Sequence, residues 1–206
     1  FVSTPNETTT EFVAAVHQLT RKLDDDPYTD TLWGILTGFD AANALAIAKH
    51  REPLTIHKVA SGTEIALQCC TEGLWYDELV KNKLVQKKRD TTAKQLRGPD
   101  DTTAALVDTL NQYQADLFVT SGHATQGDWM IGFRYRNGFF RSKAGQMFGV
   151  DTNKTRIDID SNNPKVYLPI GNCLMGSING PDAMALAWMN DVGVKQMIGY
   201  TVPTWY

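Results

Sequence analysis

Cysteine is scarce in this sequence, and the few cysteines lack the spacing of a metal or redox site. The 206 residues include three cysteines and four histidines, and no Cys-x-x-Cys pair occurs. This excludes a zinc ribbon and a thioredoxin-like motif. Cys69 and Cys70 are adjacent, and because neighbouring cysteines rarely bridge each other, we expect free thiols at both positions.

A surplus of positive charge and long apolar runs are also lacking. The chain has 20 Lys and Arg residues against 23 Asp and Glu, a net charge of −3, so no basic surplus is available for binding nucleic acid. No apolar run approaches the roughly 20 residues of a membrane span. Neither Gly-x-Gly-x-x-Gly nor Gly-x-x-x-x-Gly-Lys-Ser/Thr occurs, so the sequence lacks the common nucleotide-binding loops.

What is present is the composition of an ordinary globular domain. Hydrophobic residues make up 42% and charged residues 21%, and the length fits one α/β domain with a modest insertion. We expect an N-terminal arm and helix over residues 1–30 and one domain over 31–206, with a β-meander inserted at about 127–163. Phe1 at the start and an abrupt end indicate a fragment of a longer protein or a processed chain.

Apolar periodicity predicts alternating helices and strands, the pattern of a parallel sheet with helical crossovers. Helices are expected over residues 11–23, 41–50, 103–113 and 181–192. Strands are expected over residues 31–37, 54–60, 117–120 and 196–201, and a basic run over 81–89 is either an edge strand or a solvated face. In the meander, short strands are expected over residues 131–136, 138–141, 147–150 and 156–159, with a hairpin turn at Asn137-Gly138.

Two apolar runs end in residues that can perform nucleophilic catalysis. The stretch 116–123 (DLFVTSGH) ends in glycine and then histidine, and the stretch 165–173 (KVYLPIGNC) ends in glycine, asparagine and cysteine. The carboxyl ends of parallel strands meet at one edge of a sheet, where open α/β sheets bind ligands. A cysteine and a histidine at that edge would be a nucleophile and its base.

The chemistry of such a pair needs a thiolate and an oxyanion site. A nearby imidazolium stabilises the thiolate, and backbone N–H groups stabilise the oxyanion. The N–H groups of Ala124 and Cys173 are our candidate donors, and Gly122 and Gly171 permit tight turns that bring the backbone close to a substrate. A histidine at a strand end is also commonly solvated, and a single cysteine is commonly a core residue, so the pattern alone leaves both interpretations open.

At these residues the sequence resembles the caspase–hemoglobinase superfamily of cysteine peptidases, and most closely the gingipain-like peptidases of bacteria. Cys173 follows His123 by 50 residues, comparable to the spacing of about 50 in caspases. The similarity covers about residues 30–206 and depends on the order of four short stretches, which are 33–40 (WGILTGFD), 120–125 (TSGHAT), 169–176 (PIGNCLMG) and 197–206 (MIGYTVPTWY).

The resemblance implies a three-layer α/β/α sandwich with a mostly parallel sheet, and a cysteine endopeptidase that acts on peptides or proteins. His123 would be the general base and acid, and Cys173 the nucleophile. Members select a charged or amide residue before the scissile bond, and Asp40 is the nearest match to the acidic residue that lines this pocket in gingipain-like enzymes; its other interpretation is a helix cap. Gly122 and Asn172 are further expected substrate-binding residues. A processed peptidase of this kind would be secreted, periplasmic or at the cell surface.

Two residues depart from the family pattern. Ala124 stands where the family usually has glycine, and Asn172 stands where many members have a small residue. These departures favour an alternative, a catalytically silent protease-like domain used for binding or assembly. A small-molecule thiol hydrolase is a third class that fits the same pair.

Oxygen-rich side chains gather in the expected meander, and calcium prefers such ligands. Some gingipain-like enzymes bind calcium, but the spacing here matches no calcium loop, so turn formation is the alternative. No other cofactor is expected. The residues concerned are Asp151, Asn153, Asp158, Asp160 and Asn162.

Overall fold

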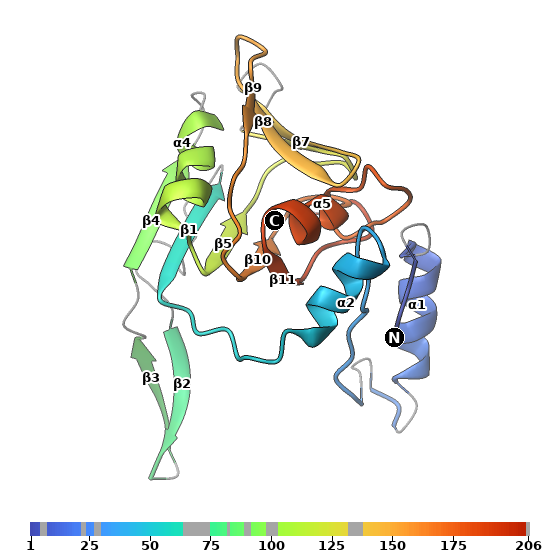
Figure 1. Ribbon diagram of the computed structural model, residues 1–206. Coiled ribbons are helices and arrows are strands. Elements are labelled where there is room, and N and C mark those ends of the chain that lie inside the picture. Colours follow the sequence, from blue (N-terminus) through green and yellow to red (C-terminus); the bar gives the residue numbers. More distant parts are fainter. Residues whose placement is uncertain are drawn as a thin grey trace.

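The computed structural model shows a mixed α/β fold built on a five-stranded sheet in the order β11-β10-β5-β1-β4 (Figure 1). Every neighbouring pair in this sheet is parallel, so the carboxyl ends of its strands lie at one edge. The structure describes residues 1–4, 8–21, 24–26, 30–63, 75–81, 83–88, 92–97, 103–131 and 138–204. The strands are β1 (Lys58–Thr63), β4 (Thr92–Arg97), β5 (Leu117–Thr120), β10 (Lys165–Pro169) and β11 (Val194–Met197).

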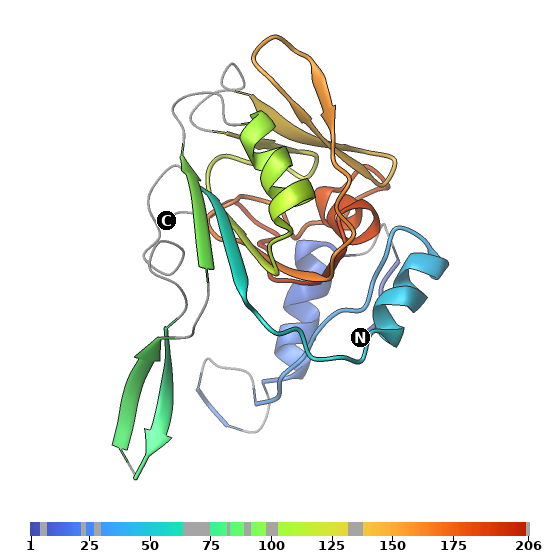
Figure 2. The ribbon, with the colours of Figure 1, turned by 60° about the vertical axis from the view of Figure 1, so that its left-hand side comes forward.

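One face of the parallel sheet carries the main core. Helix α4 (Thr103–Asp108), the π-helical turn Thr109–Tyr113 and helix α5 (Met184–Asp191) bury apolar side chains against this face. Figure 2 shows α4 and α5 on the same side of the sheet. Aromatic rings fill the centre, where they contact one another in edge-on, tilted or stacked pairs, and such pairs add to the stabilisation from burial alone. The buried rings are Phe118, Trp129, Phe140, Tyr167 and Trp188.

The expected β-meander is present between β5 and β10. It is a four-stranded antiparallel sheet in chain order, and it packs against α4 and α5. The predicted strand 131–136 and the Asn137-Gly138 turn fall mostly on residues 132–137, which lie outside the described residues, as do Cys69 and Cys70. The meander strands are β6 (Asp128–Met130), β7 (Phe139–Lys143), β8 (Gln146–Val150) and β9 (Arg156–Asp158).

A separate hairpin, β2 (Trp75–Val80) and β3 (Lys83–Lys88), projects away from the rest of the chain (Figures 1 and 2). It contains most of the basic run over residues 81–89, for which the sequence left open an edge strand or a solvated face, and the structure makes β3 one strand of this two-stranded hairpin. Within the part of the chain that the structure describes, no helix is long and apolar enough to cross a membrane.

The predicted strand over residues 31–37 is wrong. Leu36 forms a single bridge to Val2, its N–H donates to the carbonyl of Phe1, and its carbonyl accepts from the N–H of Ser3. The N-terminal arm thus forms the hydrogen bonds with this segment that a neighbouring sheet strand would have formed. An apolar run indicates burial, but it does not specify which strand edge will pair with it.

The predicted core strand over residues 196–201 is also partly wrong. Strand β11 ends at Met197 and lies at the edge of the sheet, and Ile198 is 76% exposed. After Met197 the chain leaves the sheet and runs beside the loop that follows β10. The N–H of Gly176 donates to the carbonyl of Tyr200 at 2.8 Å, and the backbones of Gly176 and Gly199 lie in close contact.

Helices α1 (Thr10–Leu19) and α2 (Ala41–Lys49) begin at side-chain caps, and the cap at Asp40 is one that the sequence predicts. Thr9 accepts a hydrogen bond from Phe12 at the start of α1, and Asp40 does the same for Asn43 at the start of α2. Side-chain oxygens at these positions satisfy amide groups that have no partner inside the helix. Helix α1 ends four residues before the predicted limit of residue 23.

Candidate active site

Strands β5 and β10 are neighbours in the sheet, and they deliver His123 and Cys173 to the same edge. Thr120 pairs with Pro169 in the parallel register, so the loops carrying the histidine and the cysteine leave the sheet side by side. Gly122 has φ +120° and Gly171 has φ +80°, backbone conformations that glycine adopts readily. The turn that each glycine was predicted to make is therefore present.

A side chain connects the two loops directly before the candidate pair. Asn172 Nδ2 donates to the carbonyl oxygen of Gly122 at 2.9 Å. Asn172 was predicted to contact substrate, but the structure buries it completely. Because its amide is engaged with the neighbouring loop, Asn172 lies behind the candidate site and not in it.

Asn172 is also held by hydroxyl groups of the two strands. Thr120 Oγ1 donates to Asn172 Oδ1 at 2.7 Å and lies 2.8 Å from the hydroxyl of Tyr167. A threonine hydroxyl carries one proton, so Tyr167 must be the donor to Thr120. Burial raises the pKa of Tyr167 above its ordinary value, which keeps this phenol protonated as a donor.

The backbone before and at His123 is held by three successive carbonyl groups. The indole N–H of Trp129 donates to the carbonyl of Ser121 at 3.1 Å, and the N–H of Met130 donates to that of His123 at 2.9 Å. Asn172 binds the carbonyl of Gly122 between them. The His123 side chain is exposed to solvent, while its backbone is held in place by these hydrogen bonds.

Cys173 is partly exposed, and its sulfur lies against the chain that follows β11. The N–H of Thr204 lies 3.4 Å from Sγ, and the carbonyl oxygen of Thr204 lies 3.6 Å from it. These two contacts join the cysteine side chain to the segment that follows β11. The next residue, Leu174, has φ +60°, an uncommon conformation for a side chain of this size.

The loops that carry His123 and Cys173 are neighbours, but the two side chains do not hydrogen-bond to each other, and within the described residues the imidazole has no hydrogen-bond partner. Catalytic pairs are often loose when no substrate is bound. Among the described residues, the backbone N–H groups of Ala124 and Cys173 have no hydrogen-bond acceptor. They remain available for the oxyanion role predicted for them.

Asp40 is a helix cap. Its Oδ1 accepts from the N–H of Asn43 at 2.8 Å, and Asn43 in turn donates to the carbonyl of Met189 in the last turn of α5. Helix α2 therefore packs at the end of α5 that leads into the beginning of β11. The structure does not bring Asp40 together with His123 and Cys173, and it supports the capping interpretation.

The oxygen-rich side chains of the meander serve turns and ion pairs. Asp151 Oδ1 accepts from the N–H of Thr155 at 2.7 Å, and Asp158 pairs with Arg156 at 2.6 Å. Among the described residues, no three His, Cys, Asp or Glu side chains are grouped so that they could hold a metal ion. Turn formation accounts for the geometry that is seen.

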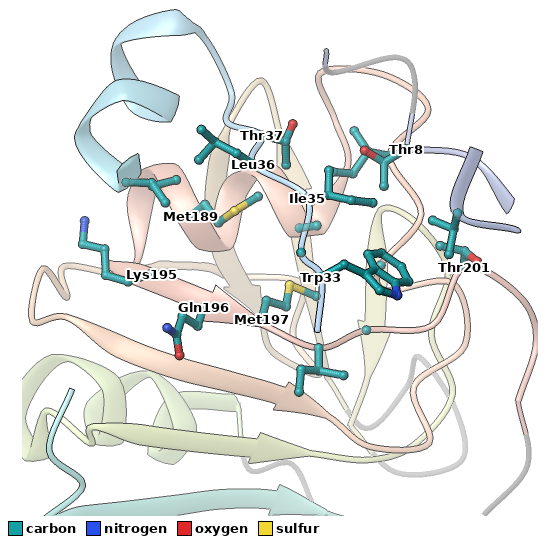
Figure 3. Close-up of a pocket in the computed structure, with 18 residues that line it drawn as sticks. Thr8, Trp33, Ile35, Leu36, Thr37, Met189, Lys195, Gln196, Met197 and Thr201 are labelled. Carbon is teal, nitrogen blue, oxygen red and sulfur yellow. The ribbon is translucent and has the colours of Figure 1, made fainter. Parts of the chain in front are cut away.

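A pocket of about 550 Å³ lies along β11, between this strand and the segment 33–37 (Figure 3). Its walls are mainly apolar and include Trp33, Met189 and Met197. It approaches the cysteine loop at Gly176, and neither His123 nor Cys173 lines it. Segment 33–37 lines the pocket because it is not a strand of the sheet, which the sequence did not predict.

Sequence reasoning also missed Thr120 and Tyr167. The available signal was a hydroxyl at an inward position in each of two apolar strands, since a buried hydroxyl needs a partner.

Comparison of the chain with protein-family models, curated proteins and solved structures finds no match. The arrangement of the described residues therefore carries the functional argument.

Proposed function

We propose that this protein is a cysteine endopeptidase of the caspase–hemoglobinase type, similar to the gingipain-like peptidases, with a three-layer α/β/α arrangement. The observation that carries the proposal is the hydrogen bond from Asn172 to Gly122. It joins the residues directly before Cys173 and His123, in the loops that follow two neighbouring parallel strands. This arrangement supports a nucleophile and its base at the ligand-binding edge of the sheet.

In the proposed reaction, His123 takes the thiol proton of Cys173, and the resulting thiolate attacks the carbonyl carbon of a peptide bond and forms a C–S bond. The carbonyl π electrons move to oxygen, and the N–H groups of Ala124 and Cys173 stabilise the oxyanion. His123 gives its proton to the amide nitrogen as the C–N bond breaks, which releases the amine product. His123 then takes a proton from water, the hydroxide attacks the thioester, and the acid product leaves the thiolate.

The surroundings of the pair support these roles. Exposure of the His123 ring lets it exchange protons with solvent and substrate, and partial exposure of Cys173 lets a carbonyl reach sulfur. The N–H of Thr204 lies 3.4 Å from Sγ and helps to hold the sulfur in position. A peptide would lie across the carboxyl edge of β5 and β10.

We propose that the enzyme is located outside the cytoplasm, as a secreted, periplasmic or cell-surface protein.

One observation favours the second candidate, a catalytically silent binding or assembly module. The sulfur of Cys173 contacts both backbone groups of Thr204, while the His123 imidazole has no partner among the described residues. If this contact persists when a peptide binds, sulfur stays out of reach of the base. The two functions differ in whether His123 affects the reactivity of Cys173.

A peptidyl electrophile that alkylates active-site cysteines tests this directly. We expect covalent modification at Cys173, mapped by peptide mass spectrometry, and a loss of at least tenfold in its rate in His123→Ala. His57→Ala is the matched control, because His57 is exposed and lies before β1, at the opposite edge of the sheet. An equal rate in the wild type and His123→Ala would exclude the pair.

A further inference from the structure

We propose that Asn172 is a positioning residue, acting with Thr120 and Tyr167 as a hydrogen-bonded relay that sets the position of the His123 loop relative to Cys173. The inference depends on the proposed function, because it concerns how the same pair is held. The relay runs from the Tyr167 hydroxyl to Thr120 Oγ1, from Thr120 to Asn172 Oδ1, and from Asn172 Nδ2 to the Gly122 carbonyl.

The direction of the relay is determined by its ends. Tyr167 can donate, the carbonyl of Gly122 can only accept, and Thr120 has one proton to give. The relay therefore has one consistent arrangement of protons, with no alternative that keeps every bond. It also orients the Asn172 amide, because Nδ2 must face Gly122 and Oδ1 must face Thr120.

The relay crosses between the two strand ends three times. Tyr167 belongs to β10, Thr120 to β5, Asn172 to the loop after β10, and Gly122 to the loop after β5. Each bond therefore resists sliding of one strand end past the other. The last two members of the relay are adjacent to the pair in sequence, since Asn172 directly precedes Cys173 and Gly122 directly precedes His123.

The first member of the relay is itself held by packing. The ring of Tyr167 lies 4.4 Å from that of Trp188 and 5.7 Å from that of Phe118, measured between centroids, and all three side chains are buried. The phenol oxygen is thus aimed at Thr120 by the aromatic core. A role in packing alone would not need a polar side chain at position 172, because burying an amide costs free energy unless the amide is hydrogen-bonded.

The test compares Thr120→Val with Thr120→Ser. Valine has nearly the shape of threonine but cannot donate to Asn172, whereas serine keeps the hydroxyl. The readout is the effect of His123 on the reactivity of Cys173. In the wild type and in each Thr120 variant, the rate of Cys173 alkylation by iodoacetamide with His123 present is divided by the rate in the same protein carrying His123→Ala, from pH 5.5 to 9. We expect Thr120→Val to reduce this ratio at least fivefold near pH 6.5, and Thr120→Ser to restore it to within twofold of the wild type.

A purely structural role predicts another result. In that case Thr120→Val lowers the melting temperature, but the folded protein keeps the wild-type ratio and pH profile, and this outcome would overturn the proposal. Should Thr120→Val fail to fold, Tyr167→Phe removes the first donor of the relay and is judged by the same ratio. If His123→Ala has no effect in the otherwise wild-type protein, the proposed function itself fails, which is a distinct result.

Discussion

Asn172 Nδ2 and the carbonyl oxygen of Gly122 are 2.9 Å apart, and this contact joins two loops whose next residues are Cys173 and His123. Fifty residues, including the whole meander, separate the two positions in the chain. Parallel pairing of β5 with β10 places both loops at one edge, and the asparagine amide then sets their relative position.

Tyr167→Phe should lower the free energy of unfolding by about 1–2 kcal/mol, because Thr120 loses its buried donor. Chemical denaturation at constant pH measures the change. Tyr200→Phe is the control, since Tyr200 is 39% exposed and should change stability by less than about 0.5 kcal/mol. Equal effects of the two substitutions would show that the Tyr167 hydroxyl contributes nothing to the fold.

Gly176→Ala should destabilise the protein by about 1–3 kcal/mol and slow the labelling of Cys173. An added Cβ at Gly176 would lie 2.5 Å from the carbonyl oxygen of Gly199 and displace the chain that brings Thr204 to sulfur. Gly180→Ala is the matched control, because a Cβ there has no atom within 4 Å. Thermal unfolding and the labelling rate are measured together, and unchanged labelling in a destabilised Gly176→Ala protein would separate the two effects.

Asp40→Ala should cost about 1 kcal/mol of stability through loss of the α2 cap, while Asp40→Asn should cost only a fraction of that. Neither change should alter which peptides are cleaved or labelled. Denaturation and a positional peptide library check both statements. A shift in cleavage preference in Asp40→Asn would restore the interpretation of Asp40 as a specificity residue.

Lys165 should make stability depend on pH in the alkaline range. Its Nζ is buried and bonds to Ser161 Oγ and to the carbonyls of Asn163 and Val192, and burial, with repulsion from Lys195, lowers its pKa from 10.5 to about 8. The unfolded chain therefore binds more protons than the folded one between pH 8 and 10.5. Stability from this group should increase as pH rises through that window, by at most about 3 kcal/mol.

The difference in unfolding free energy between the wild type and Lys165→Met isolates this contribution. Methionine has a similar length and does not titrate, so the other groups cancel. We expect the wild type to gain stability relative to Lys165→Met from pH 8 to pH 10. A constant difference across this range would mean that Lys165 keeps its ordinary protonation equilibrium in the folded protein.

Several parts of the fold could be predicted because the local sequence determines them. The helix over residues 41–50 is marked by Asp40 as a cap, and strand 117–120 is a short apolar run that ends near a glycine. Two such strands ending in glycine indicated that His123 and Cys173 lie at sheet edges. The meander was likewise indicated by short runs and turn residues.

Other parts depend on contacts that no local pattern encodes. The apolar segment 31–37 resembles a strand, but its hydrogen bonds go to the N-terminal arm, a choice between competing partners. The burial of Asn172 depends on the register of β5 against β10, which brings Thr120 beside it. From the sequence alone, an asparagine beside a candidate nucleophile was as compatible with substrate contact as with support from behind.

Hydrolysis of a peptide library by the purified protein tests the central claim most directly. The wild type should cleave peptides at defined positions, and both Cys173→Ala and His123→Ala should reduce the initial rate at least a hundredfold, while His57→Ala retains it. Cleavage that survives Cys173→Ala, or a folded wild type that cleaves no peptide in the library, would contradict the assignment of Cys173 and His123 as a peptidase pair.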